Sequence, residues 1–174
     1  PANRNDGSCS DLVAATDPST PLSGAEVEVK ALVQGKAKEV WLELPTGPVP
    51  LLPREGNLYA ARLRLFLPPG FHTLTVRAQG EEEAEAPLFL QVVAGPLYSP
   101  EALEGPKVRL ALRFRAKEVA LRGESRSFAL KSEDGYTWTG EVALSPGRHT
   151  LLVLADGETL GPVDLSLPSE SASQ

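Results

Sequence analysis

The sequence contains no methionine, one cysteine and two histidines among its 174 residues. The single thiol, Cys9, rules out an internal disulfide, so packing alone has to stabilise the fold. Zinc sites need three or four Cys, His or carboxylate ligands, and neither histidine has a companion at ligand spacing. We therefore expect no metal site and no cofactor.

Long apolar runs are also missing. No stretch approaches the roughly 20 apolar residues that a membrane-spanning helix needs, and no signal-type segment is present. The lack of methionine and the start at Pro1 suggest the mature or excised portion of an exported protein, which predicts an extracytoplasmic location, in the cell envelope or secreted. Scarce Asn and Gln beside abundant Leu, Arg, Glu and Pro fit a thermophilic source, although a GC-rich genome produces the same bias.

Positive charge is limited as well. The net charge of −6 argues against nucleic acid as a partner, because phosphate binding needs a clustered positive surface. The one basic cluster places Arg109, Arg113 and Arg115 on one face of an expected strand. A solvated sheet face is the favoured interpretation, and an anion site is the alternative.

A repeat dominates what is present. Residues 67–80, LPPGFHTLTVRAQG, return at 144–157 as LSPGRHTLLVLADG, with Gly147 following Gly70 at an offset of 77 residues. Each copy combines a Pro-Gly turn, a strand with apolar residues at every second position, and a closing glycine. The offset exceeds solenoid repeats of roughly 20–50 residues and suits a compact β-sandwich of about 80–100 residues.

The repeat divides the chain into two modules. We expect a flexible leader over 1–20, in which Asp11–Ala15 could add a short edge strand or helical turn, a first domain over 21–95 and a second over 101–168. Pro96 and Pro100 make 96–100 a short stiff linker, and 169–174 a polar tail. Expected strands are 26–33, 39–44, 59–67, 71–80, 87–93, 107–115, 117–122, 127–131, 136–144, 148–155 and 162–167.

Short strands, Pro and Gly turns and the lack of helical periodicity predict an all-β fold of two tandem β-sandwiches. Prolines 45, 48, 50 and 53 lead us to expect an edge strand or irregular crossover at 49–52. The Tyr-led strand, the Leu-x-Pro-Gly-x-His-Thr-Leu turn and the Val-x-Ala strand resemble bacterial immunoglobulin-like and fibronectin type III-like domains over nearly all of 21–168. The order of the short motifs Val-x-Val, Leu-Pro, Tyr-x-Ala and Pro-Gly-x-His is also similar to that of β-rich modules that precede peptidoglycan-peptidase domains.

His72 and His149 hold equivalent places in the two copies. Each shares the parity of the inward apolar residues, so we interpret both as structural braces whose ring nitrogens bond nearby backbone. The acidic run at 81–85 indicates a solvated hairpin tip, with calcium binding as the weaker alternative. No nucleophile motif accompanies the histidines, and Cys9 is interpreted as a bystander thiol, so we predict no enzyme activity.

Outward-facing apolar residues supply the candidate interaction surface. The alternation of residues predicts that Trp41 and Phe66 point to the outer face of their strands. If they converge with Tyr98 of the linker, the three aromatic side chains would stack on a sugar or bind a protein. Leu152 and Leu154 occupy outer positions that Thr75 and Arg77 hold in the first copy, which predicts that an interface partly buries them.

We therefore expect a non-enzymatic structural and protein-interaction module pair from a bacterial cell-envelope or secreted protein. Its partner would be another protein or a neighbouring domain of the same polypeptide. The alternatives are an accessory region of a peptidoglycan- or carbohydrate-active enzyme and a carbohydrate-binding pair with a cell-wall glycan as partner.

Overall fold

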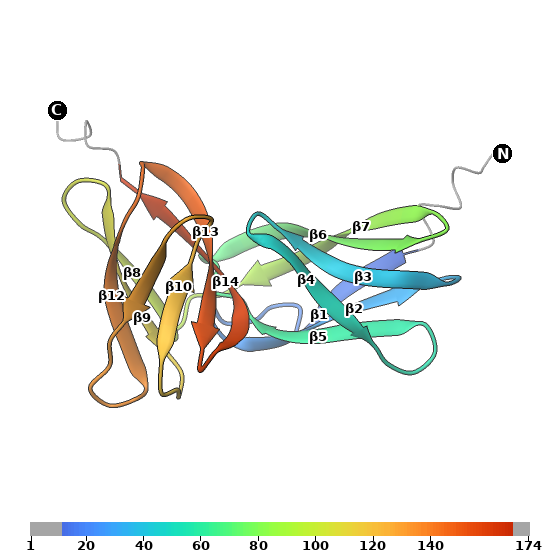
Figure 1. Cartoon of the computed structure of the whole chain (residues 1–174), viewed down its shortest axis with the longest axis horizontal. Helices are drawn as coiled ribbons and strands as arrows, with labels where there is room; N and C mark the ends of the chain where they lie inside the picture. The colour runs from blue at the N-terminus through green and yellow to red at the C-terminus, as the bar shows by residue number, and fades with distance from the viewer. Residues whose placement is uncertain (1–11, 169–174) are drawn as a thin grey trace. The chain divides into compact units, whose positions relative to one another are not determined.

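The computed structural model describes residues 12–168, which form fourteen strands and no helix (Figure 1). The strands are β1 Leu12–Asp17, β2 Glu26–Val33, β3 Ala37–Leu44, β4 Gly47–Pro53, β5 Leu58–Arg64, β6 Gly70–Gly80, β7 Glu83–Val92, β8 Tyr98–Ala102, β9 Lys107–Arg113, β10 Val119–Arg122, β11 Ser127–Leu130, β12 Thr137–Ala143, β13 Gly147–Ala155 and β14 Glu158–Leu167. The all-β prediction is confirmed.

Period-two alternation explains the strands. In β2 the side chains of Val27, Val29, Ala31 and Val33 are buried, while the residues between them face outward or are only half-buried. β7 alternates in the same way over its ten residues. A strand buries one face against the facing sheet and leaves the other in water, so the hydrophobic pattern selects the face.

The described chain forms two compact units. The first contains residues 26–63 and 70–92 together with the strand β1, and the second contains 22–25, 64–69 and 93–168. The first unit orders its strands β1-β2-β5-β4-β3-β6-β7, and the second has a four-stranded sheet β11-β10-β13-β14 and a three-stranded sheet β12-β9-β8. Segments 22–25 and 64–69, which the sequence assigns to the first module, are thus grouped with the second.

The sequence repeat is a structural repeat in the same register. β6 lies between β3 and β7, and β13 lies between β10 and β14. Val40 pairs with Ala78 in the first unit, and their counterparts Val119 and Ala155 pair in the second. Gly70 and Gly147 begin the repeated strands at φ of 132° and 117°, a conformation that L side chains rarely adopt.

The proline-rich β4 differs from the expected edge strand. Pro48 and Pro50 lie opposite Glu43 and Trp41 of β3, and the strand then switches to β5, where Leu52 pairs with Ala60. Both prolines have the same parity, so the backbone N–H groups of Val49 and Leu51, which alternate with them, remain for the ladder with β3. A strand that serves one partner at a time thereby tolerates prolines in an internal position.

Two expected connecting segments are strands instead. Leu12–Asp17 pairs with β2 as β1, so the leader prediction is wrong for these residues and the edge-strand alternative is correct. The predicted linker fails at Tyr98, Ser99 and Pro100, which pair with β9 as the start of β8. β8 ends its sheet, so Pro100 interrupts no internal ladder. Cys9 and the tail 169–174 lie outside the described residues.

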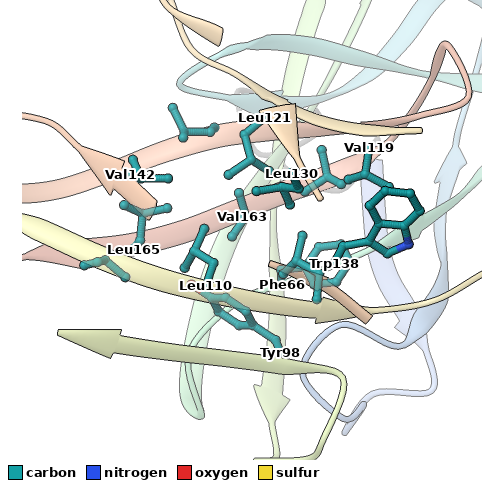
Figure 2. Close-up of a cluster of buried hydrophobic side chains, with 14 of the residues drawn as sticks. Phe66, Tyr98, Leu110, Val119, Leu121, Leu130, Trp138, Val142, Val163 and Leu165 are labelled. Carbon is teal, nitrogen blue, oxygen red and sulfur yellow. The ribbon is translucent and has the colours of Figure 1, made fainter. Parts of the chain in front are cut away.

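The core of the second unit is closed by Phe66 (Figure 2). Its ring is fully buried, 6.0 Å from the Tyr98 ring in an edge-on arrangement and 5.8 Å from the Phe114 ring. The Phe66 N–H donates to the Pro162 carbonyl, and the Asp164 N–H donates to the Phe66 carbonyl, both at 3.0 Å. This segment therefore covers part of the open edge of β14 as well as filling the core.

Candidate functional site

The three aromatic residues expected to converge do not form one surface. Phe66 and Tyr98 are buried in the core of the second unit, so the prediction of a shared site with Trp41 is wrong. The outward orientation predicted for Phe66 from strand alternation is wrong because β5 ends at Arg64. Phe66 instead forms an isolated bridge with Val163 of β14. Trp41 alone of the three remains accessible, half-buried on β3.

Trp41 lines a groove of about 760 Å³ on the first unit. Three strands supply its walls: β3, the proline-rich β4, and β5 through Tyr59. The apolar residues among them are Ala37, Val40, Trp41, Pro48, Pro50, Leu51, Leu52, Pro53 and Tyr59. Leu52 is 62% exposed and stands at the surface of this groove. The proline-rich sequence of β4 thus builds an apolar wall, which the sequence analysis did not anticipate.

Ion pairs and a hydrogen bond hold the Trp41 ring. Its indole Nε1 donates to Glu43 Oε1 at 3.0 Å, and the same carboxylate oxygen lies 3.1 Å from Arg77 Nε. Arg77 also reaches Glu85 at 2.8 Å, and the cross-strand register places it beside Trp41. Each exposed pair contributes under about 1 kcal/mol, but together they restrict the rotamers of the indole.

Two charged residues, Lys38 and Glu39, line the groove beside a β-bulge. A β-bulge between Ala37 and Glu39 leaves Lys38 without a register partner on β6. Lys38 and Glu39 both line the groove and are exposed, and neither forms an ion pair or side-chain hydrogen bond with a residue in 12–168. Bulges commonly redirect side chains beside binding sites. The groove therefore combines an apolar floor with one available ammonium and one available carboxylate.

The histidines occupy the expected face. His72 and His149 are half-buried on β6 and β13. The His149 Nε2–H donates to the Ser145 carbonyl at 2.8 Å, which is the kind of backbone contact the sequence suggested. The role of both residues as braces stays a prediction.

Leu152 and Leu154 lie on the outward side of β13, away from the core cluster that contains Leu151 and Val153. Leu152 is only 8% exposed and Leu154 is half-buried. Their predicted interface stays a prediction.

The arginines of the basic cluster form ion pairs and hydrogen bonds at the surface. Arg109 pairs with Glu101 at 3.5 Å and Glu141 at 3.2 Å, and Arg113 donates to the Pro96 carbonyl at 2.6 Å. Within residues 12–168 no group of three or more His, Cys, Asp or Glu could hold a metal ion. The same range contains no helix long and apolar enough to span a membrane.

Among residues 12–168, two titratable groups have shifted pKa values, and both shifts have structural causes. Burial, followed by the charge of Asp164, raises the pKa of the Tyr98 hydroxyl well above its ordinary value; this hydroxyl donates to the Asp164 carbonyl at 2.7 Å. The backbone N–H of Thr137, then that of Tyr136, holds the pKa of the Asp134 carboxyl well below its ordinary value. Neither group lines the Trp41 groove.

Sequence reasoning missed other exposed aromatic residues of the first unit. Phe71 is 83% exposed and Phe89 is 68% exposed, on the outward faces of β6 and β7. Their parity was readable, because Phe89 lies between the buried Leu88 and Leu90, and Phe71 lies between the half-buried Gly70 and His72. Tyr59 could not be assigned to the groove from sequence, because the approach of β5 to β4 depends on the partner switch in β4.

The sequence matches no protein-family model and no curated protein. Solved structures similar to this chain include the adhesin FdeC of Escherichia coli, with 12% identity, a TM-score of 0.35, and 91% of this chain and 64% of that chain covered. The fibronectin(III)-like modules of CbhA from Clostridium thermocellum have 17% identity and a TM-score of 0.31, with 92% of this chain and 95% of that chain covered. The adhesin InvE of Yersinia pseudotuberculosis has 13% identity and a TM-score of 0.34, with 94% of this chain and 61% of that chain covered.

This chain spans less than two thirds of the length of both adhesin chains. At these identities and TM-scores, the similarities carry no argument about function. The strand order and pairing make this an all-β chain, with one seven-stranded sheet in the first unit and a four-stranded and a three-stranded sheet in the second.

Proposed function

We propose that this chain is a non-enzymatic interaction and spacer region of a bacterial cell-envelope or secreted protein, and that its partner binds in the Trp41 groove of the first unit. The groove is the observation that carries the proposal. It is concave, mainly apolar and fringed by a few polar groups, which is the usual composition of a binding site.

The restrained indole favours binding at this position. A side chain that is already ordered loses little conformational entropy when a partner arrives. Glu43 and Arg77 provide that order. The corresponding position in the second unit is Ala120, which pairs with Leu154 as Trp41 pairs with Arg77. The second unit therefore has no equivalent aromatic groove, and the proposal gives it the role of a spacer.

Co-sedimentation with isolated bacterial cell envelopes tests the proposal. The wild-type chain should sediment with them, and Trp41→Ala should weaken the association at least about tenfold, since central aromatic residues contribute about 2 kcal/mol or more to interfaces. Phe71→Ala is the matched control, because it removes a more exposed aromatic residue that does not line the groove. Equal sedimentation of Trp41→Ala and wild type would refute the assignment of the groove.

The same groove also suits the second candidate, an accessory region that targets a peptidoglycan- or carbohydrate-active enzyme to its substrate. The complete reading frame separates the two, since a zinc-peptidase or glycosidase motif beside this segment would favour the accessory role.

A further inference from the structure

We propose that the Trp41 groove binds a neutral, hydroxyl-rich glycan chain, one molecule per chain. This inference rests on the proposed function, in which the groove is the binding surface, and it specifies the chemical class of the ligand. The groove volume of about 760 Å³ lies within the roughly 300–1,000 Å³ that is typical of small-molecule sites. A short stretch of linked sugar rings is a ligand of that size.

The floor of the groove offers flat C–H and ring surfaces. Trp41 and Tyr59 contribute aromatic surface, and Pro50 and Pro53 contribute rigid pyrrolidine rings. Pyranose rings expose apolar C–H faces that pack against such flat surfaces, and aromatic side chains combine a large apolar area with a defined orientation. The groove is therefore suited to a ligand made of rings with apolar faces.

The hydrogen-bonding groups of the groove distinguish a glycan from a peptide. Proline-rich peptides also bind in aromatic-lined grooves, but their backbone carbonyls need donors from the groove. Here the indole N–H of Trp41 is taken by Glu43, and the Tyr59 hydroxyl is directed to the Ala37 carbonyl at 3.4 Å, so the Lys38 ammonium is the one groove-lining side-chain donor left for a peptide carbonyl. Sugar hydroxyls both donate and accept, and the carboxylate of Glu39, which has no partner among residues 12–168, can accept from them.

The charges at the groove favour a neutral ligand over an acidic one. Lys38 is the one basic residue among the groove-lining residues, whereas Glu39 and Glu43 are both acidic. Arg77 sits between Glu43 and Glu85, so it does not leave a free positive charge beside the groove. A uronic-acid or sulfated polymer would face net repulsion here and from the chain's charge of −6.

Calorimetric titration of the whole chain with β-linked oligosaccharides of glucose and of N-acetylglucosamine tests this inference. We expect saturable 1:1 binding of at least one of them by the wild type, and none of oligogalacturonate. Trp41→Ala should lower the affinity at least about tenfold and Glu39→Gln several-fold, while Phe71→Ala should leave it unchanged. In Trp138→Phe, the emission of Trp41 should shift on binding, because Trp41 is then the one indole in the chain.

Absence of binding by both neutral oligosaccharides would overturn the inference, as would unchanged affinity in Trp41→Ala. Preferential binding of a proline-rich peptide in the groove would also overturn it. Failure of the glycan inference is distinguishable from failure of the proposed function. If envelope association depends on Trp41 but resists competition by the oligosaccharides and is abolished by protease treatment of the envelopes, the groove binds a protein and the glycan inference is wrong.

Discussion

Truncation of Phe66 should destabilise the second unit, although this residue comes from the connection between β5 and β6 of the first. Its ring is fully buried among Tyr98, Phe114 and Val163. Aromatic side chains bury about 150–250 Å² each. At about 25 cal/mol per Å² this corresponds to roughly 4–6 kcal/mol as an upper bound. Measured Phe→Ala changes in cores cost about 3–5 kcal/mol, which agrees with this figure.

A loss of that size is a large share of the stability of a small domain, which is about 5–15 kcal/mol. For a domain of about 60–100 residues, 1 kcal/mol moves the midpoint of thermal unfolding by about 4–8 °C, so Phe66→Ala should lower it by at least about 12 °C. The change should be read from the fluorescence of Trp138 in a Trp41→Phe background. Trp138 is buried in the same core, where its Nε1 donates to the Phe114 carbonyl at 3.1 Å.

Phe71→Ala provides the control, because Phe71 is 83% exposed and close to Phe66 in sequence. Surface substitutions of this kind normally change stability by no more than about 0.5 kcal/mol. If Phe66→Ala and Phe71→Ala shift the Trp138 transition equally little, Phe66 does not complete the core of the second unit. The division of the chain into units would then need another explanation.

Three further predictions concern single contacts of the second unit. Gly161→Ala should destabilise it, because φ is 153° and a Cβ there would overlap the backbone carbonyl of Arg64; thermal unfolding at Trp138 measures this. The folded-state pKa of Asp134 is depressed, so its stabilisation is complete above its ordinary value of 3.8 and is lost as pH falls through the lower folded value. The difference in unfolding midpoint between wild type and Asp134→Ala should therefore shrink as pH falls below 3.8. His149→Ala should cost about 1 kcal/mol in denaturant unfolding, since it removes the hydrogen bond to the Ser145 carbonyl.

The Gly161 prediction has a matched control, and each of the three has an outcome that would contradict it. Gly157→Ala has a positive φ but open space around a Cβ, so it should cost less than Gly161→Ala. Equal costs would show that backbone conformation alone matters at Gly161. A pH-independent effect of Asp134→Ala would mean that its carboxylate is not stabilised by the backbone donors. An unchanged midpoint in His149→Ala would contradict the brace role.

The repeat made the general fold predictable. Alternation and the Pro-Gly turns located most strands, and the duplicated segment predicted two equivalent central strands, which β6 and β13 are. Side-chain parity also placed Trp41 on the outside of its strand. These are local properties, because the period of a strand is a matter of neighbouring residues.

Parity could not say where a strand stops. Phe66 looked like an outward residue of a long β5, but the strand ends at Arg64 and the next residues join β14 by a bridge to Val163. Tyr98 looked like part of a linker, but it begins β8 and fills the same core.

The amino-acid sequence by itself determined that the chain is all-β and duplicated, because period-two burial and the turn residues are encoded within a few positions of one another. The tertiary structure decided which aromatic residues are available. Phe66 is buried in the core of the second unit. Trp41 lies with Tyr59 and two prolines in a groove, because β4 changes pairing partners between β3 and β5. That change depends on the pairing of distant strands, which no local pattern specifies.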